Sequence, residues 1–180
     1  GIDLEVFKPE PNLFKKKHGL ENERIVLGVS YGFGERKGLK DFLKVAERLP
    51  EGFRVVLIGA DEQDKKQLSS STAFYLEKTE SVQELVEAYS DADVLLNLTY
   101  EDTFPTVNLE AMACGTPVIT YRTGGSPESL TTESGLVVNK GDVDAVLEYI
   151  ESMKKTVDIS VVVTAHGEGF LWHKTIMSVM

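Results

Sequence analysis

The sequence predicts an α/β fold, a Rossmann-like doubly wound parallel sheet, with a short strand–loop–helix at the C-terminal end. Three observations support this prediction. Six short aliphatic or β-branched runs recur from residue 25 onward, and amphipathic segments separate them. The runs are unbroken rather than alternating, which is typical of parallel strands buried on both faces. Strand–helix alternation of this kind implies right-handed crossovers between neighbouring parallel strands.

The expected strands lie at residues 25–30, 54–59, 72–76, 93–98, 116–120 and 135–138. The expected helical segments lie at residues 38–49, 61–68, 81–90, 105–114, 126–130 and 141–155. Leu39, Phe42 and Val45 illustrate the apolar spacing of a helix that covers a sheet. Pro105 suits a helix start, and Gly115 suits a helix end.

The chain divides into three predicted parts. Residues 1–24, punctuated by Pro9 and Pro11, are expected to form an inter-domain linker and a short helix. Residues 25–155 form the main domain. Residues 156–180 begin a fresh strand–loop–helix that cannot complete a core alone, so they are expected to be the truncated start of a second domain. The absence of an initiator Met at Gly1 predicts that the sequence is a piece of a longer chain.

The composition excludes several classes of protein. A net charge of -10 argues against general binding of nucleic acid or of anionic membranes. No apolar run approaches the ~20 residues of a membrane span, and the first residues, GIDLEVFKPE, have neither the basic start nor the apolar run of a signal peptide. The single cysteine, Cys114, fits a reducing compartment, so we expect a cytoplasmic protein. The three histidines are scattered and give no metal-ligand spacing. Asn97-Leu98-Thr99 matches a glycosylation acceptor but is interpreted as the end of a strand.

Ligands of open parallel sheets bind outside the carboxyl ends of the strands. The loop after the first strand, SYGFGERKG, offers Gly34 for close backbone approach and Arg36 and Lys37 for charge. The loop after the fifth strand, TGGSPE, offers the amides of Gly124 and Gly125, with a serine placed to cap the following turn. The alternative is that both loops are simple turns.

The loop after the fourth strand is the most unusual. Glu101 and Asp102 emerge there at the predicted ligand edge. Thr103, Thr106 and Glu110 then follow at i, i+3 and i+7 and point back towards the same edge. A glutamate among apolar residues needs hydrogen-bonding partners, and a polyhydroxyl ligand supplies them. A solvated or salt-bridged glutamate is the alternative.

These motifs carry a resemblance to a known family. GIDLEVFKP, ERKGLKDFL and EDTFPTVNLEAMACGTPVITYRTGGSPE together resemble the C-terminal, donor-binding half of family 4 retaining glycosyltransferases. The resemblance covers residues 1 to about 155 and implies one half of the two-domain B-type fold. It implies a domain that binds a nucleotide diphospho-sugar, with a hexose or related sugar moved to a glycan or lipid acceptor with retention.

The resemblance also implies roles for individual residues. Glu110 would accept hydrogen bonds from the ribose hydroxyls, and Lys37 would neutralise the departing diphosphate. Seven residues separate the acid that holds the transferred sugar from the glutamate, which selects Asp102, with Glu101 in reserve. No metal or other cofactor is implied. The remaining implied donor-binding residues are Arg36, Gly34, Phe104, Thr106, Val107, Gly124 and Gly125.

Two features depart from this pattern or extend it. Many relatives carry an arginine six residues before the lysine, where this chain has Tyr31. Either Arg36 substitutes for that arginine, or stabilisation of the diphosphate is weaker in this chain. The tail ISVVVTAHGEGFLWHKTIMSV resembles the first strand and loop of family 2, A-type glycosyltransferases, which implies a parent with two fused transferases. An extra strand docked on the main sheet is the alternative for this tail.

The predicted partners are a nucleotide diphospho-sugar, an acceptor domain before Gly1 and the fused C-terminal transferase, with peripheral membrane association through the missing parts. The chain alone is expected to bind nucleotide but to be inactive in transfer. One alternative is a non-catalytic scaffold module, favoured by Asp102 and Tyr31. A nicotinamide-dependent oxidoreductase and a nucleotide-sugar epimerase are the others.

Overall fold

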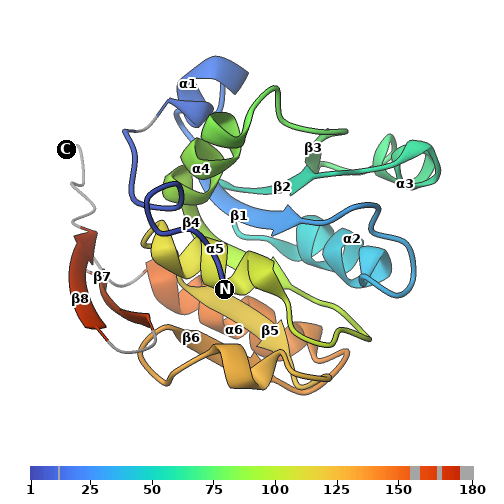
Figure 1. Ribbon diagram of the computed structural model, residues 1–180. Coiled ribbons are helices and arrows are strands. Elements are labelled where there is room, and N and C mark those ends of the chain that lie inside the picture. Colours follow the sequence, from blue (N-terminus) through green and yellow to red (C-terminus); the bar gives the residue numbers. More distant parts are fainter. Residues whose placement is uncertain (12, 155–158, 166–167, 175–180) are drawn as a thin grey trace.

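The computed structural model describes residues 1–11, 13–154, 159–165 and 168–174 and confirms the doubly wound parallel sheet. Six parallel strands lie in the order β3-β2-β1-β4-β5-β6 at the centre of the domain (Figure 1). The strands are β1 (Arg24–Val29), β2 (Phe53–Ile58), β3 (Phe74–Leu76), β4 (Ala92–Asn97), β5 (Val118–Tyr121) and β6 (Gly135–Val138).

Helices cover both faces of this sheet (Figure 1). They are α1 (Phe14–His18), α2 (Leu39–Arg48), α3 (Glu62–Leu68), α4 (Val82–Asp91), α5 (Thr106–Ala113) and α6 (Val143–Lys154), with a 3₁₀ turn η1 (Pro127–Ser129). Helices α2 and α6 pack on one face, and α1, α4 and α5 pack on the other. No helix among the described residues is both long and apolar enough to cross a bilayer.

Burial on both faces explains the unbroken apolar strands. Successive side chains of a strand point to opposite faces. In β1, Val26 belongs to the core under α2 and α6, whereas Ile25 and Leu27 belong to the core under α1, α4 and α5. All three side chains are fully buried. A strand with only one covered face would alternate polar and apolar residues instead.

The strand order reverses between β1 and β4, and this reversal positions the site. Strands β2 and β3 extend the sheet on one side of β1, and β5 and β6 extend it on the other side of β4. The chain leaves β1 towards α2 on one face and leaves β4 towards α5 on the opposite face. The two loops therefore diverge at the carboxyl edge and leave a crevice between them.

The C-terminal part differs from the sequence prediction. Strands β7 (Ile159–Ala165) and β8 (Glu168–Lys174) pair antiparallel in a sheet of their own, apart from the six-stranded sheet. The predicted strand–loop–helix is wrong at residues 168–174, which form a second strand, and Phe170 and Trp172 favour a strand by their β-propensity. Residues 155–158, 166–167 and 175–180, which belong to the predicted second domain, lie outside the described residues.

The segment expected to be helical at residues 126–130 is only the short turn η1. Pro127 takes the first position of this turn, as predicted. The expected cap from Ser126 is wrong: its backbone is itself in the right-handed helical region, and its hydroxyl makes no capping hydrogen bond. The Ser126 hydroxyl is fully buried, with no hydrogen-bond partner among the described residues.

A cluster of charged side chains docks α1 on α4. Glu84 is nearly buried and accepts from His18 Nε2 at 2.9 Å, while Lys17 Nζ lies 2.8 Å from the same carboxylate. The backbone N–H of Glu80 also donates to Glu84. Burial by itself raises the pKa of Glu84, but the hydrogen bonds from Lys17, the Glu80 amide and His18 outweigh it and lower this pKa to about 2.

Replacing Glu84 by Gln is expected to lower the free energy of unfolding by about 1–2 kcal/mol near pH 7, because the groups that donate to this nearly buried carboxylate lose a charged partner. A carboxyl pKa lowered on folding contributes stability that is present above the unfolded-state value of 4.5 and is lost as the pH falls towards about 2. The difference between wild type and variant, measured by urea denaturation, should therefore shrink below pH 4.5.

Glu80→Gln is the matched control, because the Glu80 side chain pairs with the same Lys17 but is 80% exposed. It should change stability little. A Glu84→Gln effect that stays constant from pH 7 to pH 3 would contradict the ionic origin of this docking.

Candidate ligand-binding cleft

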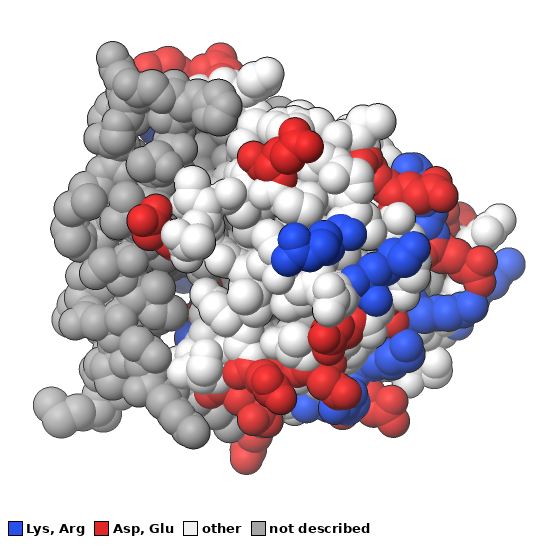
Figure 2. Space-filling view, turned by 90° about the horizontal axis from the view of Figure 1, so that it is seen from below, with Lys and Arg blue, Asp and Glu red and all other residues white. Residues whose placement is uncertain are grey.

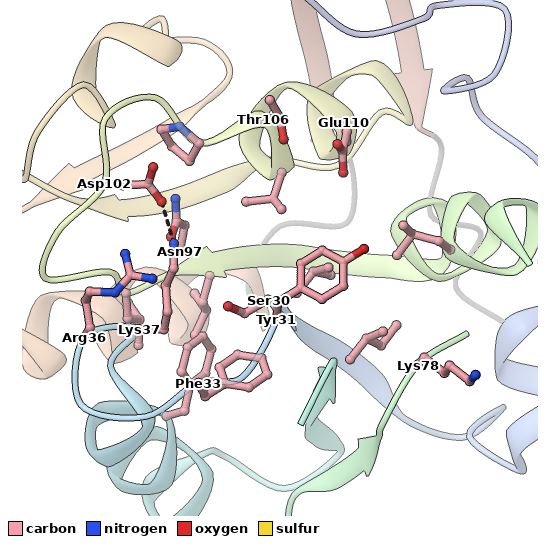
Figure 3. A pocket seen from close by; sticks show the side chains of 18 of the residues that line it. Ser30, Tyr31, Phe33, Arg36, Lys37, Lys78, Asn97, Asp102, Thr106 and Glu110 are labelled. Carbon is pink, nitrogen blue, oxygen red and sulfur yellow. Dashed lines mark hydrogen bonds and ion pairs between the residues drawn. The ribbon is translucent and has the colours of Figure 1, made fainter. Parts of the chain in front are cut away.

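A cleft of about 480 Å³ opens at the carboxyl ends of β1 and β4 (Figure 3). Figure 3 shows Arg36, Lys37 and Asp102 gathered towards one end and Glu110 towards the other, with Thr106 between the two acids. Three segments supply the main polar lining. They are the loop after β1 with Ser30, Tyr31, Arg36 and Lys37, the segment from β4 into α5 with Asn97, Asp102, Thr106 and Glu110, and the loop after β3 with Lys78 and Thr79.

An ion pair joins the two diverging loops. Lys37 Nζ lies 2.6 Å from Asp102 Oδ2, and the two side chains are only 23% and 17% exposed. Asp102 lines the cleft, whereas the side chain of Glu101 is exposed and contributes only its backbone carbonyl, which accepts from Thr99 Oγ1 at 2.8 Å. Of the two acids, the structure therefore brings Asp102 to Lys37.

A close backbone approach places Lys37 in the cleft. Gly38 has φ of 79°, and a Cβ atom there would lie 2.2 Å from the carbonyl oxygen of Leu98. Only glycine tolerates both the left-handed backbone and this contact. The Tyr100 N–H donates to the Arg36 carbonyl at 2.8 Å across the same junction. The Lys-Gly pair thus presses the loop after β1 against the end of β4.

A buried carboxylate also holds the loop after β1 close to the end of β4. Asp41 in α2 accepts from the hydroxyls of Tyr100 at 2.7 Å and Tyr121 at 2.9 Å, and from Lys44 Nζ at 2.8 Å. Burial alone raises the pKa of Asp41, but these hydrogen bonds prevail and hold it below its usual range. The bond to Asp41 raises the pKa of Tyr100 to about 12. Tyr100, two residues before Asp102, is therefore hydrogen-bonded to α2, the helix that follows Lys37.

The two glycines of TGGSPE support the acidic loop rather than line the cleft. Gly124 has φ of 48°, and a Cβ there would lie 1.7 Å from the carbonyl oxygen of Asp102. A Cβ on Gly125 would lie 2.2 Å from the carbonyl oxygen of Thr103. The turn after β5 therefore lies directly against the loop after β4, and its glycines set the position of Asp102.

Glu110 projects from α5 into the cleft, as its sequence position predicts (Figure 3). Its Oε2 atom accepts a 2.7 Å hydrogen bond from the hydroxyl of Tyr89, which is fully buried in α4. Burial first, and the nearby Glu110 carboxylate second, raise the pKa of Tyr89 well above its ordinary value. Tyr89 fixes the carboxylate. Tyr89 lies in the segment expected to be helical at residues 81–90, and a buried tyrosine hydroxyl requires a partner.

The start of α5 faces the same cleft. The helix begins at Thr106, and its N-cap is Pro105, whose side chain has no group to accept from the first amides. Thr106 and Val107 line the cleft, and Phe104 beside them is 46% exposed. A helix start carries unpaired amides and a partial positive charge, so this end of α5 favours an anion.

The glycine-rich loop after β1 is arranged differently from the expectation. The N–H of Gly34 donates to Asp64 Oδ1 at 2.9 Å, and the N–H of Phe33 donates to Asp64 Oδ2 at 2.7 Å. Asp64 is 1% exposed and stands in the first turn of α3. Gly34, expected to approach a ligand, is not among the residues that line the cleft, and a carboxylate of the chain already binds its amide.

Sequence reasoning missed two further features of the cleft. Asn97, interpreted as a strand end, is buried and lines the cleft floor. Lys78, in the loop after β3, adds a third cation to Arg36 and Lys37. Tyr31, noted as the replacement of an arginine, stands fully exposed at the rim. No group of three or more His, Cys, Asp or Glu side chains within the described part of the chain is placed to hold a metal ion.

Figure 2 shows the face seen from below Figure 1. Uncharged atoms fill much of its middle, and towards one side Lys and Arg side chains are interleaved with Asp and Glu. Such a mixture does not create the one-sign field that attracts a polyanion. The cations of the cleft are thus a local feature of a chain whose net charge is -10.

The fold and the cleft define a Rossmann-like α/β domain with a cleft at its topological switch point, where ligands of such sheets bind. Within that class, the chain belongs to the family of glycosyl transferases group 1, whose family model matches residues 11–158.

Known proteins agree with this assignment. The chain is 28% identical over 199 residues to D-inositol 3-phosphate glycosyltransferase of Mycobacteroides abscessus, covering 100% of this chain and 44% of that protein. The chain thus spans less than half the length of that relative.

Two solved structures share the fold. The C-terminal domain of the group 1 glycosyl transferase LpcC from Francisella tularensis matches with a TM-score of 0.73 and 20% identity, covering 87% of this chain and 89% of that one. HepE from Anabaena, solved in complex with UDP-glucose, matches with a TM-score of 0.74 and 20% identity, covering 86% of this chain and 46% of that one. The first match corresponds to one domain of a transferase.

Replacing Gly124 by Ala is expected to lower the free energy of unfolding by about 2 kcal/mol or more, because the new methyl group would meet the Asp102 carbonyl in a left-handed turn. Gly34→Ala is the control, since Gly34 has φ of 42° but open space at its Cβ position. Urea denaturation measures both. Equal losses in the two variants would show that the turn after β5 does not press on the acidic loop.

Proposed function

We propose that this chain is the donor-binding half of a retaining glycosyltransferase and that its cleft binds a nucleotide diphospho-sugar. The observation that carries the proposal is the meeting of three groups in one cleft: the Glu110 carboxylate, the start of α5 and the Lys37–Asp102 pair. A nucleotide diphospho-sugar offers hydroxyls, anionic oxygens and hydroxyls again, in that order along its length.

The Glu110 end suits a ribose. Its carboxylate can accept hydrogen bonds from two vicinal hydroxyls, while the Tyr89 hydroxyl holds one of its oxygens in place. Hydrogen bonds to an ionised, partly buried carboxylate are about twice as strong as neutral ones. The nucleoside would therefore lie at this end, next to the exposed rim formed by Tyr31 and Lys78.

The middle and the opposite end suit a diphosphate. Lys37 and Arg36 supply positive charge, and the amides at Phe104, Thr106 and Val107 lie at the positive end of α5. In the proposed reaction the bond from the anomeric carbon to the diphosphate breaks, and an acceptor hydroxyl oxygen takes its place on the same side. The proton of that hydroxyl passes to the departing diphosphate. Lys37 and the helix start would stabilise the charge that develops on the departing diphosphate.

Asp102 would hold hydroxyls of the transferred sugar, a hexose or a related sugar. Because the chain spans less than half the length of the Mycobacteroides abscessus relative, the acceptor would bind to a part of the protein outside residues 1–180. The chain alone is then expected to bind nucleotide without transferring sugar. The absence of a metal requirement, the fused C-terminal transferase and the cytoplasmic location remain predictions.

Thermal unfolding of the 180-residue chain tests nucleotide binding directly. UDP, GDP and ADP are the probes, and UDP comes first because HepE, which shares the fold, was solved with UDP-glucose. A ligand at a hundred times its dissociation constant adds ~2.7 kcal/mol of stability, or about 5–10 °C in Tm at this size. Glu110→Gln should abolish most of the shift, and Glu101→Gln should preserve it.

Absence of a shift with all three nucleotides, on a folded sample, would contradict the proposal. The scaffold alternative predicts that outcome, and it predicts the same outcome for nucleotide sugars.

Lys37→Ala is expected to raise the Kd of the nucleoside diphosphate about 10–100-fold, because a charge-assisted contact of about 1.5–3 kcal/mol is lost. The matched control is Lys40→Ala on α2, where Lys40 pairs with exposed Glu35 and does not line the cleft. Isothermal titration with the diphosphate and with the bare nucleoside separates the contributions. An equal effect on both ligands would show that Lys37 does not contact the diphosphate.

A further inference from the structure

Asn97 is a polar side chain in a position that the sheet would ordinarily fill with an apolar one. It is the last residue of β4, lies between Leu96 and Leu98, and is only 8% exposed. A buried amide without hydrogen bonds destabilises a fold, so its polar atoms require partners. It lines the floor of the cleft beside Asp102 and Lys37 (Figure 3).

A buried chain of hydrogen bonds fixes the orientation of this amide. Asn97 Nδ2 donates to Asn108 Oδ1 at 3.0 Å, and Asn108 Nδ2 donates to Ser129 Oγ at 2.9 Å. Ser129 Oγ donates in turn to the Ser126 carbonyl at 2.6 Å. The chain runs from the cleft floor through α5 to the turn after β5, and Asn108 at its centre is fully buried.

In this arrangement, part of the Asn97 amide remains available to hydrogen-bond a ligand in the cleft. A side-chain amide has two N–H donors and a carbonyl oxygen that accepts twice. The network engages one N–H, so a second N–H and the carbonyl oxygen remain for the side of the amide that borders the cleft. A sugar hydroxyl both donates and accepts, and it matches this pair of groups. A phosphate, which only accepts, does not match both groups. The edge of a base can also match both, but on the proposed function the nucleoside lies at the Glu110 end of the cleft.

The position along the cleft indicates which part of the donor reaches Asn97. Figure 3 places Asn97 at the Asp102–Lys37 end, away from Glu110. On the proposed function, the ribose occupies the Glu110 end, so the opposite end receives the transferred sugar and its link to the diphosphate. We propose that Asn97 is a specificity-determining contact that hydrogen-bonds a hydroxyl of the transferred sugar, held in place by Asn108 and Ser129. This proposal rests on the proposed function of the cleft.

The test compares ligands with and without the sugar. The 180-residue chain and its Asn97→Leu variant are titrated with UDP and with UDP-glucose, UDP-galactose and UDP-N-acetylglucosamine, and with GDP and GDP-mannose. The leucine fits an apolar strand and removes both hydrogen-bonding groups. We expect the Kd of the preferred nucleotide sugar to rise about tenfold, the effect of one lost hydrogen bond to a desolvated group, and that of the free diphosphate to change less than twofold.

Asn139→Leu is the matched control, because Asn139 is exposed and lies outside the cleft lining. Asn97→Ala is the second variant, should the leucine prevent folding. An equal loss for nucleotide sugar and free diphosphate, no loss for either, or unfolding of both Asn97 variants would overturn the sugar contact.

Failure of the proposed function has a different signature. If wild type binds none of these nucleotides or nucleotide sugars, the cleft is not a nucleotide-sugar site. The proposed role of Asn97 is then refuted as well. If wild type binds the free diphosphates but none of the sugars, nucleotide binding stands and the sugar contact alone is refuted.

Discussion

The reversal of strand order between β1 and β4 is the constraint on which the rest of the site depends. It sends the chain to opposite faces of the sheet after two neighbouring strands, so their loops diverge and leave a crevice. Several contacts between distant segments hold that crevice in one shape. The contact of Gly38 with Leu98, the bonds from Tyr100 and Tyr121 to Asp41, and the Lys37–Asp102 pair all cross it.

The net negative charge of the chain does not conflict with the proposed binding of an anionic ligand in the cleft. The net charge of -10 sets the average field but not the local one, because exposed charges are screened within about 10 Å at ordinary ionic strength. Inside the cleft, Arg36 and Lys37 and the start of α5 lie close to where an anion would sit. The two carboxylates there, Asp102 and Glu110, are hydrogen-bonded and lie towards opposite ends.

Local sequence pattern was enough to predict the sheet, because the four inner strands β2, β1, β4 and β5 are mainly buried and therefore consist of unbroken apolar runs. The six strands lie within two residues of their expected positions, with the third shorter at its start. Lys37, Asp102 and Glu110 were also predictable, since motif spacing and strand ends bring them to one edge. The spacing argument chose Asp102 over Glu101, and the cleft contains the Asp102 side chain.

What the sequence did not show depends on contacts between distant segments. Asp64 binds the amide of Gly34 from 30 residues away, and Tyr89 reaches Glu110 from 21 residues away. Neither pairing leaves a periodic signal in the chain. Asn97 was visible only as part of a short motif, because its partner Asn108 is on α5. The strand β8 was missed because glycine and polar residues around Phe170 and Trp172 were interpreted as a loop and helix.

The central claim is that the cleft holds a nucleotide diphosphate between Glu110 and Lys37. A crystal structure of this chain with the nucleoside diphosphate that it binds most tightly tests the claim most directly. The account predicts ribose hydroxyls within hydrogen-bonding distance of the Glu110 carboxylate and diphosphate oxygens against Lys37 and the start of α5. A nucleotide bound elsewhere on the chain, or one bound in the cleft with its ribose remote from Glu110, would contradict it.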